Sequence, residues 1–341
     1  MKKVKIENAV GMILAHDLTR IVPGEFKGAA FKKGYIIQEE DVELLKSMGK
    51  NHIYILEMTP DILHENDAAI RIARAAAGKN LHLSEPAEGK VNFIATKKGL
   101  LKINLPLLYK INELEMIILA TLHNNTPVKE GQIVAGTRII PLVIEKEKIE
   151  QVESYCQADC PVIWVEEMEC IKVGIVVTGT EVYEGRITDR FGPVLADKVK
   201  NYGCELAGIS YAPDDKALIK QEILKLIDKG AELVMTSGGM SVDADDVTPA
   251  AIREMADEVI TYGSPVLPGA MFMLAYKGDV PILGVPACGM FYKVTVLDLV
   301  LPRILSGEKL ERRDLTRLAH GGLCLGCKVC RYPVCPFGKQ G

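Results

Sequence analysis

A glycine-rich stretch in the second half of the chain contains the residues best suited to hold a charged ligand. Thr236-Ser237-Gly238-Gly239 follows the apolar run Leu233-Val234-Met235, and Asp245-Asp246 comes shortly afterwards. Thr248-Pro249 then fits the N-cap and the first position of a helix. Glycine lets the backbone approach a ligand, and a helix N-terminus presents free N–H groups, so a strand, turn and helix in this order can hold an anion.

The acids decide between two interpretations of this stretch. An ordinary turn between a strand and a helix would carry the same glycines. Carboxylates beside an anion usually need a divalent cation to offset repulsion, so Asp245 and Asp246 favour a phosphate held together with Mg²⁺.

The elements around this stretch alternate regularly from residue 171 onward. The patterns predict strands at 171–177, 205–210, 232–236, 271–276 and 280–284, and helices at 192–201, 216–228, 249–256 and about 290–305. Alternation at this spacing predicts a mostly parallel sheet with helices on both faces. Ligands of such sheets bind beyond the carboxyl ends of the strands. That rule brings together Thr178 to Glu181, Asp214, Ser237 to Asp246, and Pro286 to Gly289.

The first half of the chain has a different pattern, with short β segments between Gly, Pro and Asn and with helices at 65–77 and 146–155. No residue in it stands out as catalytic, and positioning, dimer contact or lid formation are its expected roles. We expect four parts: a leader segment at 1–60, a β-rich module with a connecting helix at 61–170, an α/β domain at 171–308 and a Cys-rich tail at 309–341.

Composition narrows the possible partners and location. The 41 basic and 45 acidic residues nearly balance, and no predicted helix carries a basic stripe, so nucleic acid is not an expected partner. No apolar run reaches about 18 residues, which argues against a membrane span. The start, Met1 to Glu7, carries an acid and is not a convincing signal peptide. We expect a cytoplasmic protein.

The tail is crowded with cysteine. Four of the nine cysteines, Cys324, Cys327, Cys330 and Cys335, have the spacing C-x2-C-x2-C-x4-C. In a cytoplasmic protein such crowding predicts metal binding rather than disulfides, and four thiolates can hold either one Zn²⁺ or an Fe–S cluster. A flexible, redox-sensitive tail is the alternative.

Six segments together are more specific than any one of them. They are V-V-T-G-T-E at 176–181, G-R-I-T-D-R at 185–190, A-P-D-D at 212–215, T-S-G-G-M-S-V at 236–242, D-V-T-P at 246–249 and L-G-V-P-A at 283–287. Their order resembles the molybdopterin-binding domain shared by molybdopterin adenylyltransferases and molybdopterin molybdenumtransferases. The resemblance covers about 171–308 and implies a three-layer α/β/α fold. The leader segment G-M-I-L-A-H-D-L-T and the β-rich module look like the longer molybdenumtransferase arrangement.

The resemblance also implies a ligand and roles for individual residues. The ligand is molybdopterin, a pterin that carries a dithiolene and a phosphate. The residues that match its binding positions are Thr178, Gly179, Ser237, Gly238, Gly239, Ser241 and Pro286. The acids Glu181, Asp214 and Asp246 match catalytic positions that hold Mg²⁺ and place molybdate or a nucleotide-activated pterin, and Asp189 matches a further acid. Proteins of this type tend to be homodimers.

Three departures from the family pattern leave two functions open. Leu267-Pro268-Gly269-Ala270 stands where molybdenumtransferases usually carry K-P-G-K, Pro286-Ala287-Cys288-Gly289 replaces a P-G-N-P-like loop, and Asp243 replaces a common Gly. A molybdenumtransferase-like enzyme would insert molybdate into molybdopterin with Mg²⁺. A non-catalytic carrier or sensor would instead bind the pterin and dock on a molybdoenzyme through the Cys-rich tail. Cys288 is either a reactive thiol near the dithiolene or a small packing residue.

Overall fold

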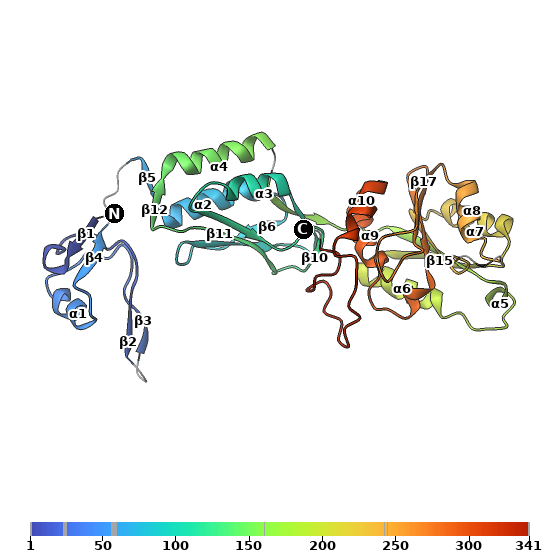
Figure 1. The fold of residues 1–341 in the computed structure, drawn as a ribbon, viewed down its shortest axis with the longest axis horizontal. Helices are drawn as coiled ribbons and strands as arrows, with labels where there is room; N and C mark the ends of the chain where they lie inside the picture. Colours follow the sequence, from blue (N-terminus) through green and yellow to red (C-terminus); the bar gives the residue numbers. More distant parts are fainter. Residues whose placement is uncertain are drawn as a thin grey trace. The chain divides into compact units, whose positions relative to one another are not determined.

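The computed structural model describes residues 2–22, 26–55, 60–159, 161–241, 243 and 245–339. The chain forms two compact units, which we describe separately (Figure 1). Unit 1 consists of Met1–Thr96, Asn104–Leu122 and Gly131–Trp164, and unit 2 of Lys97–Ile103, His123–Glu130 and Val165–Gly341.

Unit 1 is built from small antiparallel sheets and a few helices. At its start, β1 (Lys2–Lys5) pairs with β4 (His52–Ile55) and β2 (Leu18–Val22) with β3 (Phe26–Phe31), next to α1 (Asp41–Ser47). Further along, a four-stranded sheet has the order β6 (Leu81–Leu83), β7 (Lys90–Ala95), β11 (Ile133–Ile139), β9 (Ile117–Thr121), and β12 (Val143–Glu145) pairs with β5 (Ile62–His64). The helices here are α2 (Glu65–Ala76), α3 (Leu105–Asn112) and α4 (Lys146–Asp159). The expected β-rich character of the N-terminal half is confirmed. The helix α3 was not predicted.

Unit 2 is organised around one six-stranded sheet. Its order is β15 (Glu205–Ala212), β14 (Lys172–Thr178), β16 (Leu233–Ser237), β19 (Val280–Val285), β18 (Met273–Lys277), β17 (Glu258–Tyr262). The first four strands are parallel, and β18 runs antiparallel to both of its neighbours. β13 (Ile163–Glu167) leads into this unit, and β8 (Gly99–Ile103) pairs with β10 (Thr126–Val128).

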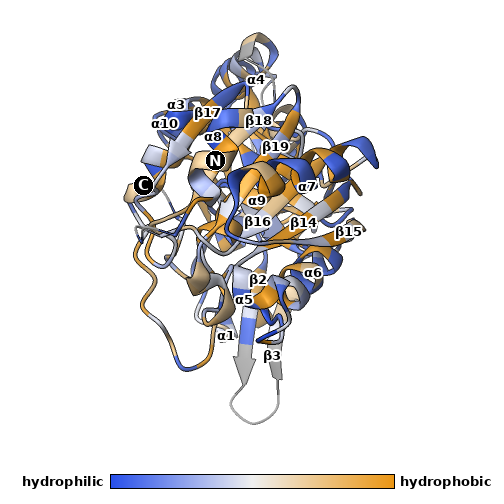
Figure 2. Ribbon diagram, turned by 90° about the vertical axis from the view of Figure 1, so that its right-hand side faces the viewer, coloured by the Kyte–Doolittle hydropathy of each residue, from blue (hydrophilic) through white to orange (hydrophobic). Residues whose placement is uncertain are grey.

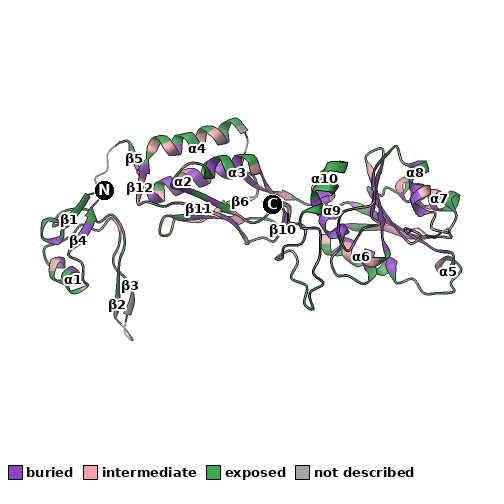
Figure 3. Cartoon of the chain, viewed as in Figure 1, coloured by how far each residue is buried: buried purple, intermediate pink, exposed green. Residues whose placement is uncertain are grey.

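Alternate residues of the central strands face two separate cores, so the sheet is the middle of three layers. Met235 and Leu283 belong to the core that contains α6 (Phe191–Tyr202) and α9 (Val296–Leu305). Their neighbours Val234 and Ile282 belong to the core under α7 (Lys216–Asp228) and α8 (Thr248–Met255). Figure 2 shows hydrophobic residues along β14, β16 and β19. Figure 3 shows the short α5 (Thr180–Tyr183) on the exposed surface. The predicted three-layer α/β/α fold with a mostly parallel sheet is confirmed.

Local signals in the sequence explain several boundaries. Asp215 accepts a hydrogen bond from the backbone N–H of Leu218 and begins α7 as an N-cap. Gly203 ends α6 in the left-handed region. The helix predicted at about 290–305 begins only at Val296 as α9, because Thr295 and Asp298 form a reciprocal capping box there, and α10 (Arg312–Thr316) follows it.

The prediction that Thr248 is an N-cap is wrong. Thr248 is the first residue of α8, and the N-cap residue Val247 makes no side-chain cap. The Thr248 hydroxyl instead contacts Thr178 Oγ1 at 3.0 Å, a tertiary contact that replaces the local cap.

Candidate functional site

The point where the strand order reverses lies beside β14. The chain passes from β14 to β15 on one side and then crosses back to β16 on the other. Such a reversal leaves a crevice at the carboxyl ends of the two inner strands, where open α/β sheets bind ligands. Val177 of β14 is opposite Ser237 of β16, and Ser237 is opposite Val285 of β19. We call this border of the sheet, where β14, β15, β16 and β19 end, the carboxyl edge.

Two glycines form the turn at the carboxyl edge of β16. Gly238 has φ of +99° and Gly239 has φ of +51°, both in the left-handed region that disfavours other residues. A Cβ on Gly238 would lie 2.1 Å from the carbonyl oxygen of Thr178. A Cβ on Gly239 would lie 2.9 Å from Thr248 Oγ1 and 3.7 Å from Asp214 Oδ1. The turn therefore packs directly against the loops that follow β14 and β15, and only glycine fits.

Thr178 connects the three elements around this turn. Its hydroxyl donates to the carbonyl oxygen of Ser237 at 3.2 Å and lies 3.0 Å from Thr248 Oγ1 at the start of α8. Thr178 is 4% exposed, so these contacts are shielded from water. The predicted ligand residue Thr178 thus positions the glycine turn and the N-terminus of α8.

Ser237 has an unusual environment. It is fully buried at the end of β16, and its hydroxyl has no hydrogen-bond partner. A buried polar group without a partner is costly in a native fold and often marks a functional position. A phosphate on the glycine turn would supply acceptor oxygens for this hydroxyl, so Ser237, Gly238 and Gly239 fit the phosphate of the predicted ligand.

The predicted acids lie just beyond the carboxyl edge and have different contacts: Glu181 is in the short helix α5, and Asp214 and Asp246 are in loops. Asp214 Oδ2 accepts bonds from the backbone N and hydroxyl of Thr180 at 2.8 and 2.9 Å. Asp246 Oδ2 accepts from the backbone N of Ser241 at 2.8 Å. Glu181 lies next to Gly179, since a Cβ there would be 3.3 Å from Glu181 Oε1.

No three Cys, His, Asp or Glu side chains converge closely enough for a metal ion in the described part of the chain. Asp214 and Asp246 each keep one oxygen outside the bonds given above, and carboxylate oxygens are ligands that Mg²⁺ accepts. The Mg²⁺ site of Glu181, Asp214 and Asp246 therefore stays a prediction.

Asp189 has a structural role at the start of α6. Its carboxylate accepts from the backbone N of Phe191 at 2.7 Å and of Gly192 at 3.0 Å, and from the Tyr211 hydroxyl at 3.2 Å. Burial, followed by the charge and hydrogen bond of Asp189, raises the pKa of Tyr211. This acid satisfies the first N–H groups of the helix.

The loop after β19 carries Pro286 and Cys288. Pro286 follows Val285 directly and precedes the short helix η2 (Ala287–Met290). Burial raises the pKa of the Cys288 thiol, so the thiol remains protonated at neutral pH, which favours the packing interpretation over a reactive thiolate.

The segment that lacks the family lysines holds the C-terminal tail. Leu267 donates its backbone N–H to Gly322 O at 2.8 Å and accepts from Cys324 N at 2.8 Å. Gly269 cannot carry a side chain, because its Cβ would lie 2.5 Å from Val296. The side chains at the two lysine positions, Leu267 and Ala270, are exposed and uncharged.

Tyr262 is a supporting residue that the sequence did not reveal. Its hydroxyl donates to the carbonyl oxygens of Met240 and Ser241 at 2.9 and 3.2 Å, which holds the chain just after the glycine turn. Tyr262 ends β17, and a tyrosine at a strand end near the site could have identified this role, but β17 itself was not predicted. Val242 and Ala244 of this loop lie outside the described residues.

Because the Ser237 hydroxyl is unpaired, its removal should affect stability and ligand affinity differently. In Ser237→Ala, removal of a buried unsatisfied group should leave the free energy of unfolding unchanged or raise it by up to about 1 kcal/mol. Affinity for a phosphorylated ligand should fall about 10- to 100-fold, because a hydrogen bond to a charged group is lost. Denaturant unfolding and equilibrium binding measure the two effects.

The neighbouring residue provides the control. Thr236 is also fully buried, but its hydroxyl has a partner: it donates to Leu283 O at 3.3 Å. Thr236→Val should lower the free energy of unfolding by about 1 kcal/mol and leave binding unchanged. Equal affinities for Ser237→Ala and the unmutated protein would show that this hydroxyl does not contact the ligand.

The fold places a glycine turn at the carboxyl edge of a three-layer α/β/α domain, and comparison with known proteins shows which family this domain resembles. Residues 174–306 match the family described as "Probable molybdopterin binding domain". This part of the chain therefore resembles the molybdopterin-binding domain family. Residues 3–57 match a family described only as a domain of unknown function.

Curated relatives are similar over a short region only. A "CinA-like protein" of Mycobacterium sp. (strain MCS) is 46% identical over 81 residues, which is 24% of this chain and 19% of that protein. A "CinA-like protein" of Mycobacterium tuberculosis is 44% identical over 77 residues, 23% of this chain and 18% of that protein. The matched region thus spans about one fifth of the length of these relatives.

Two solved structures match part of this chain. The molybdopterin biosynthesis enzyme MoaB from Thermus thermophilus has 22% identity and a TM-score of 0.35, and the match covers 40% of this chain and 98% of that one. CinA from Thermoplasma acidophilum, described as of unknown function, has 13% identity and a TM-score of 0.32, and the match covers 35% of this chain and 90% of that one.

None of the helices in the described residues is both long enough and apolar enough to span a membrane.

Proposed function

We propose that the α/β domain binds molybdopterin and serves molybdenum cofactor biosynthesis. The observation that supports it is the pairing of a glycine turn with the buried, unpaired hydroxyl of Ser237 at the strand-order reversal, in a domain that resembles the molybdopterin-binding family. In this proposal the phosphate of the pterin accepts from the backbone N–H groups of Gly238 and Gly239 and from Ser237 Oγ.

The proposed reaction is molybdenumtransferase-like insertion of molybdate into molybdopterin with Mg²⁺. Glu181, Asp214 and Asp246 would hold Mg²⁺ through the carboxylate oxygens that the protein leaves free. Bound Mg²⁺ would neutralise charge on the oxygens that react. A nucleotide-activated pterin is the form that would deliver the ligand.

A second candidate is a carrier or sensor without catalysis that delivers the pterin to a molybdoenzyme through the tail. It is favoured by Leu267, which stands at a lysine position of the family and pairs with the tail backbone instead. Without the two lysines, the carboxyl edge has fewer cations with which to attract molybdate, an anion. A cytoplasmic location and a homodimer stay predictions.

Asp246→Asn distinguishes the two candidates. The amide keeps an oxygen that can accept from Ser241 N, so molybdopterin affinity should stay within a few-fold. If Mg²⁺ takes part in the reaction, formation of active cofactor from molybdopterin and molybdate should fall at least about 100-fold, since a metal contributes several kcal/mol to transition-state stabilisation.

The control is Asp279→Asn, which removes an exposed acid in the turn before β19, at the opposite end of that strand from the carboxyl edge, and should retain turnover. The two candidates differ in the unmutated protein as well: a carrier binds molybdopterin and yields no active cofactor. Absence of molybdopterin binding by the unmutated protein would refute both candidates.

A further inference from the structure

The tail forms a closed loop that is attached to the domain at its base. Gly338 N donates to Gly321 O at 2.9 Å, which joins the two ends of the segment 322–337. We call this segment the tail loop. A Cβ on Gly321 would lie 2.3 Å from Lys339 O, so the closure requires glycine there. Leu267 pairs with the backbone at the start of the loop, as described above. The base of the tail loop is thus fixed by backbone contacts.

Two aromatic side chains attach the second half of the tail loop to the domain. The Tyr332 hydroxyl donates to the carbonyl oxygen of Asp298 in α9 at 3.0 Å. Phe337 is 3% exposed and belongs to the core shared with α6 and α9. The tail loop therefore has a defined shape although it contains no helix and only an isolated bridge, Leu267 to Leu323. Cys324 and Cys335 also pack against this core, whereas the side chains of Cys327 and Cys330 are exposed.

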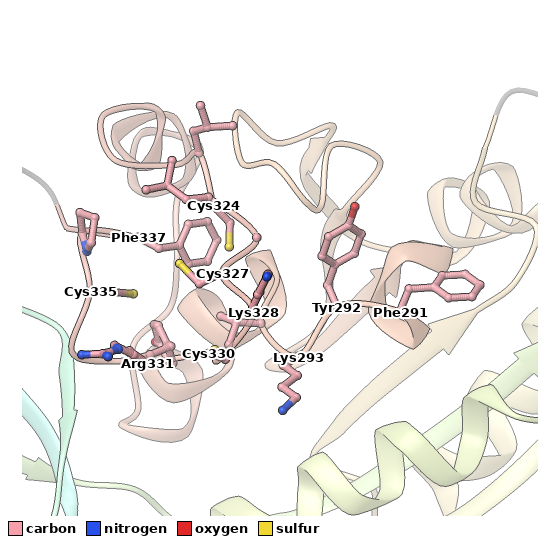
Figure 4. Close-up of a pocket in the computed structure, with 16 residues that line it drawn as sticks. Phe291, Tyr292, Lys293, Cys324, Cys327, Lys328, Cys330, Arg331, Cys335 and Phe337 are labelled. Atoms are coloured by element: carbon pink, nitrogen blue, oxygen red, sulfur yellow. The ribbon is translucent and has the colours of Figure 1, made fainter.

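The four cysteines of the tail loop line one cavity. Cys324, Cys327, Cys330 and Cys335 all contribute to the walls of a space of about 290 Å³. Figure 4 shows them around this cavity together with Phe337 and Arg331. All four are free thiols, Cys327 and Cys330 exposed and the other two half-buried. Four thiols on one cavity wall are a ligand set for a soft metal centre.

The size of the cavity favours a cluster over a single ion. A structural Zn²⁺ is closed by four ligands at about 2.3 Å and leaves no space around it. At about 290 Å³ the cavity is far larger than the space that a single ion occupies. The four thiols line this space, which a group of several atoms would fill.

The remaining walls of the cavity suit an anionic centre. Lys293, Lys328 and Arg331 line it together with the cysteines. Three cations near four thiols offset the negative charge of a thiolate-bound cluster. Apolar residues complete the lining: Val294, Leu323, Leu325, Tyr332, Pro336 and Phe337.

We propose that the tail loop binds an iron–sulfur cluster of the four-iron type, with Cys324, Cys327, Cys330 and Cys335 as its ligands. Each thiol loses its proton to solvent as the sulfur–iron bond forms. The run C-x2-C-x2-C and the proline after the last cysteine are typical of such clusters, and the loop accommodates one extra residue before Cys335.

The cluster site adjoins the carboxyl edge of the sheet. The cavity wall formed by residues 291–294 follows directly after Pro286 and η2, at the end of β19. Leu267, which holds the other side of the tail loop, lies just beyond the end of β17, a strand that runs parallel to β19. The cluster would therefore sit on the two segments that extend from the same edge as the glycine turn.

The test uses the full chain, purified without oxygen and reconstituted with ferric iron, a thiol reductant and sulfide. We expect about four irons and about four acid-labile sulfides per chain, with broad visible absorption that bleaches on reduction. Cys327→Ala and Cys330→Ala should each lose this absorption and most of the iron. Both residues are exposed, so the thermal unfolding of the two variants without iron should match that of the unmutated chain.

Cys170→Ala is the matched control, since Cys170 is an exposed cysteine outside the tail loop, and it should retain iron and sulfide in full. A chain that takes up one zinc and no labile sulfide would overturn the proposal. The same conclusion would follow if the unmutated chain bound no iron, or if the Cys170 variant lost as much iron as the Cys327 variant. The proposal does not depend on pterin binding, so the two can fail separately.

Discussion

Gly238→Ala is expected to abolish molybdopterin binding. The new Cβ would lie 2.1 Å from the carbonyl oxygen of Thr178, at a backbone φ of +99°. The turn can relieve this clash only by moving away from β14, which displaces the N–H groups that would hold the phosphate. We expect a loss of affinity of at least about 100-fold, comparable with the loss of two hydrogen bonds to a charged group. Strain and overpacking should also lower the free energy of unfolding by about 2–5 kcal/mol.

Gly230→Ala separates this effect from backbone strain. Gly230 precedes β16 and has φ of +89°, and a Cβ there would meet no atom within 4 Å. The substitution should cost about 1–2 kcal/mol of stability and leave affinity unchanged. Titration with molybdopterin below the unfolding temperature of both variants makes the comparison. If the two variants bind equally well, the glycine turn is not where the ligand binds.

Arg303→Met should produce the largest loss of stability. Arg303 is 8% exposed in α9 and donates to Glu308 at 2.8 and 3.0 Å and to Asp314 at 2.9 Å. Its removal leaves two half-buried carboxylates without their main partner, although Lys102 still contacts Glu308 at 2.7 Å. We expect the free energy of unfolding to fall by about 3–5 kcal/mol at neutral pH, measured by denaturant unfolding.

The pH dependence of stability tests whether Glu308 and Asp314 cause the loss in Arg303→Met. Burial raises the pKa of Glu308 and of Asp314, but hydrogen bonds and the charge of Arg303 outweigh it, so both pKa values lie below their usual range. The stability that these groups contribute is present above the pKa of an unfolded carboxyl and is lost as the pH falls through the folded value, from about pH 5 downward. Arg303→Met should therefore lose less stability on acidification.

Lys216→Met is the control for that experiment. Lys216 and Glu254 form an ion pair at 2.6 Å between exposed side chains. Water screens such a pair, so its removal should change stability little. If Arg303→Met loses no more stability than Lys216→Met, the ion pairs of Arg303 with Glu308 and Asp314 do not stabilise the fold as we expect.

The elements that position the site were largely predictable because strong local signals coincide there. The apolar run before Ser237, the glycines after it, and the Asp215 cap before α7 each determine structure within a few residues. The edge strand β17 was missed, because its first two residues are exposed and it lacks a continuous apolar run. The helix α3 was also missed, since its first residues Leu105-Pro106 follow a strand closely and resemble a turn.

Features that depend on packing could not be predicted. The sequence identifies Ser237 as a candidate but does not show that its hydroxyl is buried without a partner. The contact of Thr248 with Thr178 joins residues 70 positions apart and overrides the local cap. Likewise, the sequence shows that lysines are absent at Leu267 and Ala270, and only the structure shows that Leu267 holds the tail. Long-range contacts decide these details, and residue spacing does not encode them.

A crystal structure of the full chain with molybdopterin bound tests the central claim most directly. We predict that the phosphate of the pterin lies within hydrogen-bond distance of the backbone N–H groups of Gly238 and Gly239 and of Ser237 Oγ. The ring system should extend along the carboxyl edge toward Asp214. A phosphate bound anywhere else on the chain, with the Ser237 hydroxyl still unpaired, would contradict the account.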